Sequence, residues 1–193
     1  MSRPAAFLDR DGVINIDHGY VVRREEFEWV PGVREAAAQL HRAGFALVVI
    51  TNQSGIGRGL YTEVDFLRLT QWMSDEFAAF GAPLVGVYFC PHHPTDASGE
   101  FRRVCDCRKP APGLLIRAAQ ELDLDLGRSV LFGDKVSDLQ AAVAAGVPQR
   151  VLLATDGQGE PDPAATALAT ASFASLAEAV QATDWTRRIK ALP

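Results

Sequence analysis

Two acidic residues follow a short apolar run near the start of the chain. The segment Phe7–Val13 reads FLDRDGV, which places Asp9 and Asp11 two positions apart. One carboxylate in such a pair can attack phosphorus and form an aspartyl phosphate, while the other exchanges protons with the leaving oxygen and with water. The alternative is a plain turn at the end of a strand, where Asp is common. The other segments of the chain must decide between these readings.

Three later segments offer groups that would complete a phosphoryl-transfer site. Thr51–Gly55 reads TNQSG and supplies hydroxyl, amide and backbone N–H donors for phosphate oxygens, although an Asx or ST turn is the alternative. Asp134 adds a carboxylate, which suits an all-oxygen Mg²⁺ site. Lys109 adds a cation for a transferring phosphoryl group. Because each group stands at a predicted strand end or helix start, the set indicates phosphoryl chemistry.

The elements that must position these groups alternate between strand and helix patterns. Continuous apolar runs predict buried strands at 5–9, 45–51, 84–90, 129–133 and 150–153. Helical spacing predicts helices between 33 and 44, between 62 and 81, at 114–122, around 139–146 and after Phe173, where Trp185 docks. This alternation predicts an open, Rossmann-like α/β three-layer sandwich with a mostly parallel central sheet. Ligands of such sheets bind beyond the carboxyl ends of the strands, where the four groups fall.

Two long loops interrupt this alternation. They are Gly12–Pro31 and Pro91–Pro112, and loops of this length in a compact domain are usually functional or disordered. A third stretch, Asp156–Pro163, is rich in Gly and Pro and is expected to be a surface connection. No insertion is long enough for a cap, so we expect residues 1–193 to form a single domain without a large cap domain.

The second long loop contains all three cysteines of the chain. Cys90 and His92 form one short chelating pair, and Cys105 and Cys107 form another. Three sulfurs and one imidazole are a common structural Zn²⁺ set, and three unrelated thiols are the alternative. His93 is the competing ligand; we prefer His92 because its spacing mirrors that of the cysteine pair. A zinc clip over residues 90–107 would hold the loop that leads to the candidate lysine.

Composition restricts the class of protein. The chain has 193 residues, of which 48% are hydrophobic and 22% charged, as is ordinary for a soluble globular domain. Its net charge of −5 argues against a nucleic-acid or anionic-membrane partner. No apolar stretch predicts a membrane span, and the early acidic residues interrupt any signal-peptide core. We therefore expect a cytoplasmic protein that binds a small molecule. Because no long apolar face is left over for a second subunit, we also expect a monomer.

Four segments together resemble the motifs of the haloacid dehalogenase superfamily of phosphohydrolases. These segments are FLDRDGV, VVITNQSG, Lys109-Pro110 and LFGDKVSD, and they span Phe7–Asp138. The resemblance implies an Mg²⁺-dependent phosphatase with four catalytic residues: Asp9 as nucleophile, Asp11 as general acid and base, Thr51 as the phosphate-orienting hydroxyl, and Lys109 as the phosphoryl-stabilising cation. It also implies that Asp9, the backbone carbonyl of Asp11 and Asp134 bind Mg²⁺, with Asp138 supporting Lys135 or the metal shell.

Within that superfamily the loops resemble the heptose 1,7-bisphosphate 7-phosphatases of the bacterial ADP-heptose and lipopolysaccharide core pathway. DHGY at 17–20, TNQSGI-x-RG and CDCRKP carry this likeness. It implies release of the C7 phosphate of a sugar bisphosphate, a zinc loop, and substrate contacts from Asp17, His18, Gly19, Tyr20, Asn52, Gln53, Ser54, Arg108 and Lys135. The planar fork of Arg108 would recognise the second phosphate or the sugar.

Two alternatives stay open at this point. Histidinol-phosphate phosphatases share the four motifs and a comparable zinc loop, and they are the nearest alternative within the superfamily. A signalling receiver domain, which stores an aspartyl phosphate instead of hydrolysing it, is the alternative from another class. The acid two positions after Asp9 and the cysteine-rich loop argue against a receiver.

Overall fold

The structure, a computed structural model, describes residues 2–154 and 162–187 of the chain. The described strands form one sheet in the order β3-β2-β1-β4-β5-β6, in which every neighbouring pair is parallel. Their bounds are β1 Arg3–Leu8, β2 Ala46–Asn52, β3 Leu84–Cys90, β4 Leu124–Gly133, β5 Gln149–Leu153 and β6 Ala171–Phe173. The predicted open sheet is confirmed. Strand β6 was not predicted, because it has only three residues, ASF, and shows no apolar run.

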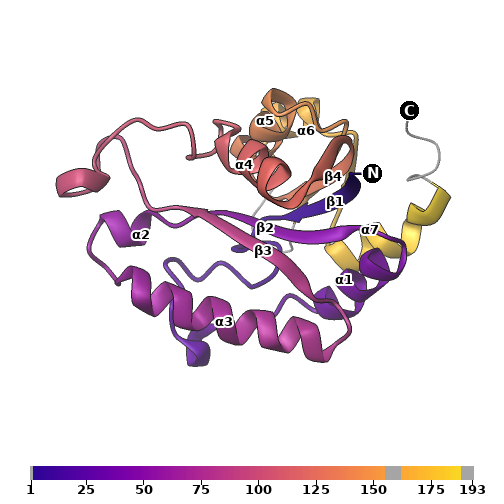
Figure 1. Ribbon diagram of the computed structural model, residues 1–193, viewed down its shortest axis with the longest axis horizontal. Helices are drawn as coiled ribbons and strands as arrows, with labels where there is room; N and C mark the ends of the chain where they lie inside the picture. Colours follow the sequence, from indigo (N-terminus) through magenta and orange to yellow (C-terminus); the bar gives the residue numbers. More distant parts are fainter. Residues whose placement is uncertain (1, 155–161, 188–193) are drawn as a thin grey trace.

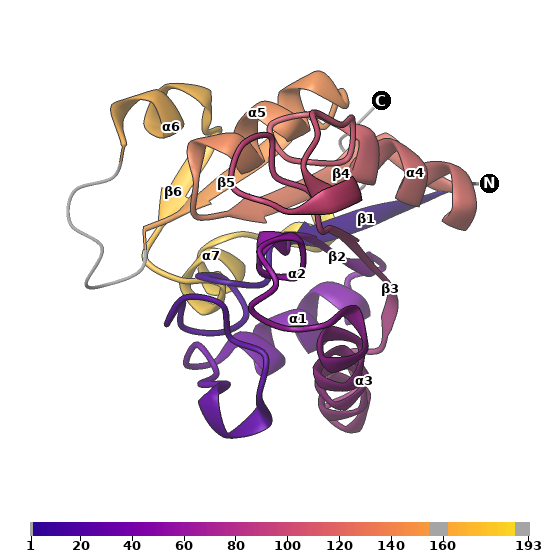
Figure 2. The same cartoon turned by 90° about the vertical axis from the view of Figure 1, so that its left-hand side faces the viewer.

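Helices cover both faces of the sheet and complete the predicted three-layer sandwich (Figures 1 and 2). One face carries α1 Val33–Arg42, α3 Glu63–Ala79 and α7 Leu176–Ala182, and the other carries α4 Gly113–Leu122, α5 Val136–Ala144 and α6 Pro163–Leu168. The short helices α2 Ser54–Gly57, η1 Arg24–Glu26 and η2 Gly99–Phe101 lie in the connections. Trp185 packs against Phe45 and Phe132, as expected of the C-terminal segment.

Strand β1 shows why the buried strands read as unbroken apolar runs. Ala6 and Leu8 point into the core shared with α1, α3 and α7, whereas Ala5 and Phe7 point into the core on the opposite face. All four side chains are fully buried. Because both faces of the strand are covered from Pro4 to Leu8, no position in that stretch favours a polar residue, and the first acid, Asp9, follows the strand.

Helix α3 begins and ends where the sequence indicates. The side chain of Thr62 accepts a hydrogen bond from the Asp65 backbone N–H, and the Asp65 carboxylate accepts one from the Thr62 N–H, which is a capping box. Gly81 then adopts a left-handed φ of 74°, a conformation that glycine adopts without strain. Strand β4 begins earlier than predicted, because the mixed segment Leu124–Arg128 pairs with the start of β1.

The two long loops stay at the carboxyl ends of the strands. Gly12–Pro31 and Pro91–Pro112 contain only η1 and η2, and among the described residues neither forms a separate cap domain. Most of the predicted surface connection at 156–163 lies outside the described residues. Within residues 2–154 and 162–187, no helix combines the length and the apolar character that a membrane crossing requires.

Candidate active site

The order of the strands brings the sequence-predicted catalytic groups together. Strand β1 lies between β2 and β4, and the chain turns away from the sheet on opposite sides after these strands. Asp9 follows β1 directly, and its N–H donates to the Phe132 carbonyl at 3.0 Å. Thr51 stands near the end of β2, and Asp134 follows β4. The reversal of strand order leaves a crevice at this edge, which is where open α/β sheets bind ligands.

Lys109 is the centre of this crevice. Its Nζ lies 2.8 Å from Asp9 Oδ1 and 2.6 Å from Asp138 Oδ1, and it donates to the Ile50 carbonyl at 3.0 Å. Two carboxylate oxygens and one carbonyl oxygen thus surround the buried ammonium. The ammonium is therefore fixed beside the carboxylate predicted to attack phosphorus. Asp138, whose role the sequence left undecided, positions this lysine and also accepts from the Lys135 backbone N–H at 3.0 Å.

The ionisation of these groups reflects crowding of charge in a buried place. Burial raises the pKa of Asp9 to about 6, with Lys109 opposing the rise and Asp138 adding to it. Burial, followed by the charge of Asp9, raises the pKa of Asp134 to about 8. Burial would lower the pKa of Lys109, but the carboxylates of Asp138 and Asp9 raise it above its ordinary value. The site therefore concentrates more negative charge than its own lysine offsets.

Asp134 shows that the crevice fits a divalent cation. Both of its carboxylate oxygens are buried, and neither has a hydrogen-bond partner in the part of the chain that the structure describes. Oxygens of Asp9, Asp134 and Asp138 lie within 4.8 Å of one another. Gly12, at a φ of 90°, brings its backbone so close to the Asp134 carboxylate that a Cβ would collide with it. Hard oxygen donors without partners are the ligands that Mg²⁺ prefers.

Asp11 is held by amide and guanidinium donors rather than by the lysine. Arg10 donates to both of its oxygens, with Nη2 2.7 Å from Oδ1 and Nε 3.1 Å from Oδ2. Asn15 Nδ2 donates to Oδ1 at 3.1 Å, and Gln53 Nε2 donates to Oδ2 at 2.9 Å. The carboxylate still lines the cavity. Asp11 is thus oriented by three neighbours while one side of it remains reachable by substrate.

Gln53 joins the two catalytic groups on β1 and β2. Its Nε2 also donates to Thr51 Oγ1 at 2.9 Å, and its Oε1 accepts from the hydroxyl of Tyr61 at 2.6 Å. Since Thr51 Oγ1 accepts this bond, its own hydrogen can be donated into the cavity. Gln53 is only 2% exposed, so its contacts are chiefly within the protein.

A cavity of about 560 Å³ opens beside these groups. The sequence-predicted residues that line it are Asp9, Asp11, Asp17, Gly19, Tyr20, Thr51, Asn52, Gln53, Ser54, Arg108, Lys109 and Lys135. Asp134 lies behind this lining, against the Gly12 backbone. His18 also stands outside the lining; its ring Nε2 lies 2.9 Å from Glu28 Oε2, and its side chain is half exposed.

Several of the lining side chains pair with one another. Lys135 Nζ lies 3.0 Å from Asp17 Oδ2 across the cavity. Asn52 uses both ends of its amide on one residue: Nδ2 donates to the Lys109 carbonyl, and Oδ1 accepts from the Lys109 N–H, each at 3.1 Å. The amide of Asn52 therefore holds the Lys109 backbone in the way that a neighbouring strand would.

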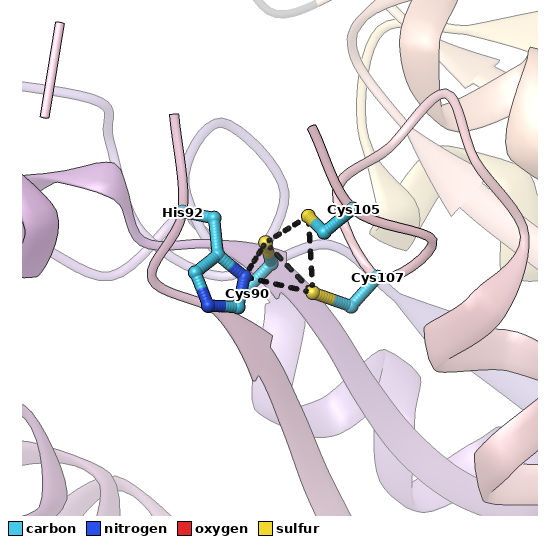
Figure 3. Close-up of side chains that lie close together, drawn as sticks. All are labelled: Cys90, His92, Cys105 and Cys107. Atoms are coloured by element: carbon cyan, nitrogen blue, oxygen red, sulfur yellow. Dashed lines mark hydrogen bonds between the residues drawn. The ribbon is translucent and has the colours of Figure 1, made fainter. Parts of the chain in front are cut away.

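The cysteine cluster comprises Cys90 at the end of β3 and, in the second long loop, His92, Cys105 and Cys107 (Figure 3). The three sulfurs and His92 Nδ1 lie within 4.8 Å of one another, with contacts of 3.1 to 3.6 Å. Ligands about 2.3 Å from a tetrahedral Zn²⁺ stand about 3.8 Å apart, so the cluster fits this ion. The ring of His93 instead accepts from the Asp96 N–H at 2.9 Å.

This cluster is connected to the crevice through Arg108. The Nη1 of Arg108 donates to the carbonyl of His92 at 3.1 Å, and the Arg108 side chain lines the cavity. Cys107 precedes Arg108 directly, and Lys109 follows it. A metal bound to His92 and Cys107 would therefore fix two neighbours of Arg108. These are the residue before it in the chain and the residue whose carbonyl accepts from its guanidinium.

Sequence reasoning missed Arg10 and Asn15, which contact Asp11, and Tyr61, which contacts Gln53. Arg10 was overlooked because a charged residue between two acids reads as exposed, yet it is fully buried. Asn15 lies in a loop without a periodic pattern, and Tyr61 lies eight positions after Gln53, beyond helix α2. The interrupted apolar pattern of FLDRDGV could have indicated Arg10. No spacing in the sequence indicates Asn15 or Tyr61.

Comparisons with known proteins agree with this geometry. Residues 4–146 match the family model of the haloacid dehalogenase-like hydrolases. A D-glycero-beta-D-manno-heptose-1,7-bisphosphate 7-phosphatase from Yersinia pestis is 48% identical over 94% of this chain and 97% of its own. The enzyme of the same name from Escherichia coli K12 is 54% identical over 80% of this chain and 81% of its own.

A solved structure extends the likeness to three dimensions. The D,D-heptose 1,7-bisphosphate phosphatase from B. bronchiseptica, crystallised with magnesium and phosphate, superposes with a TM-score of 0.75 at 32% identity. The superposition covers 93% of this chain and 97% of that one. On the matching family model, the close relatives and the shared fold, this chain belongs to the haloacid dehalogenase-like hydrolases.

Proposed function

We propose that the protein removes the C7 phosphate of D-glycero-β-D-manno-heptose 1,7-bisphosphate, as a step toward ADP-heptose and lipopolysaccharide cores. The observation that carries the phosphatase chemistry is the buried ammonium of Lys109, held between Asp9 and Asp138 at the base of the cavity. The choice of substrate rests on the relatives at 48% and 54% identity, whose substrate is this bisphosphate.

In the first half of the reaction, Asp9 attacks phosphorus in line with the leaving sugar oxygen. The bond from phosphorus to O7 breaks as the bond to the Asp9 carboxylate forms, and Asp11 gives a proton to the departing O7. The ammonium of Lys109 and the hydroxyl of Thr51 donate to the equatorial oxygens of the phosphoryl group. Both donors are nearly inaccessible to water, so they are oriented before substrate arrives.

In the second half, water hydrolyses the aspartyl phosphate. Asp11, now ionised, accepts a proton from the water as its oxygen attacks phosphorus. The bond between phosphorus and Asp9 breaks, which releases inorganic phosphate and regenerates the nucleophile. The same carboxyl group thus serves as acid and then as base.

The residues that would hold Mg²⁺ are Asp9, Asp134 and the backbone carbonyl of Asp11. When bound, Mg²⁺ supplies positive charge that offsets the negative charge of the phosphoryl oxygens and of the crowded carboxylates. The buried oxygens of Asp134, which have no hydrogen-bond partner among the described residues, support this assignment.

Recognition of the second phosphate falls to Arg108, and Lys135 and Ser54 also line the cavity. A guanidinium matches phosphate oxygens through two parallel hydrogen bonds. The cysteine cluster would hold a structural Zn²⁺ that keeps Arg108 in place. We further propose that residues 1–193 work as one domain and as a monomer in the cytoplasm, where thiols stay reduced and available to the metal.

The test is a phosphate-release screen with purified protein. The panel includes the β and α anomers of the heptose 1,7-bisphosphate, histidinol phosphate and fructose 1,6-bisphosphate. We expect the highest kcat/KM on the β-heptose bisphosphate, with one equivalent of phosphate released and the 1-phosphate as product. Preferential hydrolysis of histidinol phosphate, or release of the C1 phosphate, would contradict the proposal.

A further inference from the structure

Tyr61 has no assigned role, although its hydroxyl makes a short hydrogen bond to a residue inside the catalytic cluster. The hydroxyl donates to Gln53 Oε1 at 2.6 Å, and the ring is only 9% exposed. Tyr61 lines the cavity but reaches Asp11 only through Gln53. It follows the short helix α2 and lies beside the carboxyl end of β2.

The absence of a side chain at Gly55 leaves the space beside Gln53 that the Tyr61 ring occupies. Gly55 lies against the Tyr61 ring so closely that a Cβ on it would overlap the ring carbons. Ile56 and Phe66 belong to the same small apolar cluster as Tyr61, with Phe89 packed beside it. The glycine of the TNQSG segment is therefore required for the placement of the tyrosine, and the packing sets where the hydroxyl points.

The Asp11 carboxylate decides which way round the Gln53 amide lies, and the Tyr61 hydroxyl holds the amide there. With Oε1 accepting from Tyr61, both hydrogens of Nε2 point to catalytic groups, one to Asp11 Oδ2 and one to Thr51 Oγ1, each at 2.9 Å. The reversed amide would place its oxygen against the Asp11 carboxylate, and two acceptors would repel each other. The Tyr61 hydroxyl donates to Oε1 when the amide lies in the favoured direction, and this third hydrogen bond restrains the amide from rotating away from Asp11.

We propose that Tyr61 is a positioning residue: by fixing the amide of Gln53, it holds Asp11 in the orientation for proton transfer to the leaving oxygen. This inference rests on the proposed phosphatase function. Tyr61 touches neither the reacting atoms nor the metal ligands, and it acts through Gln53. Asn15 donates to Oδ1, and Arg10 donates to Oδ1 and, through Nε at 3.1 Å, to Oδ2. Gln53 donates to Oδ2 at the shorter distance of 2.9 Å, so its amide restrains this oxygen together with Arg10.

The first test is a double-mutant cycle with Tyr61→Phe and Gln53→Met. Phenylalanine keeps the ring beside Gly55, and methionine keeps the length of the glutamine side chain. We expect Tyr61→Phe to lower kcat on the heptose bisphosphate about tenfold with KM unchanged, and to change kcat less than about twofold when Gln53 is already methionine. Wild-type kcat in Tyr61→Phe, or the same loss in both backgrounds, would overturn the inference.

A matched control separates positioning from stability. Tyr88 is also buried, its hydroxyl donates to Glu121 of α4 at 2.9 Å, and neither residue belongs to the cavity lining. Tyr88→Phe therefore removes an equivalent hydroxyl, and we expect it to leave kcat unchanged. If Tyr88→Phe lowers kcat as much as Tyr61→Phe does, the effect is general and the positioning role is wrong.

The second test compares leaving groups. An alkyl oxygen of the sugar needs a proton as it leaves, whereas p-nitrophenolate departs as an anion. With p-nitrophenyl phosphate as substrate, we expect Tyr61→Phe to slow the first-turnover release of p-nitrophenolate less than about twofold. On the sugar phosphate we expect kcat to fall about tenfold. Equal losses on both substrates would contradict a role through Asp11.

The outcome for the substrate proposal can be distinguished from these results. If the wild-type protein hydrolyses fructose 1,6-bisphosphate or another alkyl phosphate but not the heptose bisphosphate, the substrate assignment fails. The same cycle and the same leaving-group comparison are then run on that alkyl phosphate, and they support or overturn the role of Tyr61 by the same criteria.

Discussion

The carboxylate crevice around Asp9 and the cysteine cluster around Cys90 both gather potential metal ligands, but different parts of the fold build them. The crevice uses residues at the ends of β1, β2 and β4, which the sheet brings together without help from an ion. The cluster uses Cys90 at the end of β3 and three residues of an irregular loop. The crevice is therefore expected to survive without metal, whereas the loop depends on its metal for a defined shape.

The two regions also differ in charge and access. The crevice adjoins the cavity and holds three buried carboxylates around one ammonium, so its own ligands repel one another until a cation binds. The cluster offers four ligands in a closed set, which leaves no position for a substrate oxygen. This difference indicates a metal that takes part in chemistry in the first region and a metal that supports structure in the second.

The largest effect is expected from a change within the crevice. Asp9→Asn removes the nucleophile, and kcat should fall at least about 10⁴-fold. The fold should persist, because Lys109 keeps Asp138 and the Ile50 carbonyl as partners. Phosphate release measures the first effect, and a thermal melt measures the second.

The sign of the stability effect follows from the pKa of Asp9. Its folded value of about 6 lies above the unfolded value of 3.8, so ionised Asp9 disfavours folding at pH 7.5, and a neutral Asn removes that cost. With both proteins in Mg²⁺-free buffer, the Tm of Asp9→Asn should accordingly stay within about 3 °C of the wild-type Tm or rise above it. A variant that keeps near-normal turnover, or that unfolds, would show that Asp9 is not the group we describe.

The next largest effects are expected from the removal of each metal in turn, because the loss of Zn²⁺ and the loss of Mg²⁺ should act on different regions. A nitrogen-donor chelator that takes Zn²⁺ but hardly binds Mg²⁺ should lower the Tm by about 10 °C, since the loop loses its cross-link. Transfer to Mg²⁺-free buffer without that chelator should abolish turnover and leave the Tm nearly unchanged. A melt that is indifferent to the chelator would argue against a structural zinc.

A smaller effect is expected at Asn52, whose side-chain amide holds the Lys109 backbone in place. Asn52→Ala removes both hydrogen bonds to the Lys109 backbone. We expect kcat to fall about tenfold, because the ammonium loses its fixed position while its charge remains. If KM rises and kcat stays constant, Asn52 contacts the substrate, as the sequence predicts, and does not chiefly position Lys109.

The smallest effect is expected at His18, beside a residue that should matter more. Asp17 lines the cavity and pairs with Lys135, whereas the His18 ring turns outward to Glu28. His18→Ala should change kcat/KM less than about threefold, and Asp17→Ala should lower it about tenfold. The reverse order would mean that the loop carrying DHGY rearranges when substrate binds.

Much of this arrangement could be predicted from the sequence because it depends on local patterns. Apolar runs gave β1 to β5, and the positions of Asp9, Thr51 and Asp134 at strand ends predicted the crevice. The cysteine pairs predicted the cluster, because their spacing alone restricts them to one small volume. Strand β6 and helices α2 and α6 were not predicted, since each is too short for a periodic pattern.

The interactions that the sequence did not predict are those made between distant side chains. Gln53 and Asn52 were expected to contact substrate, yet they also bind Asp11 and Lys109 within the protein. A polar residue beside a catalytic one has the same type and spacing whether it faces a ligand or its neighbour. Hydrogen bonds between residues far apart in the chain, from Asn52 to Lys109 and from Gln53 to Asp11, distinguish these cases.

The central claim is that Asp9 carries the phosphoryl group between the two halves of the reaction. Rapid acid quench of the enzyme with phosphorus-labelled heptose bisphosphate, followed by peptide mapping, tests it most directly. We predict an acid-stable, base-labile acyl phosphate on the peptide containing Asp9, with the label lost as free phosphate when unlabelled substrate is added. Steady phosphate release with no label on that peptide at any time in the first turnover would contradict the account.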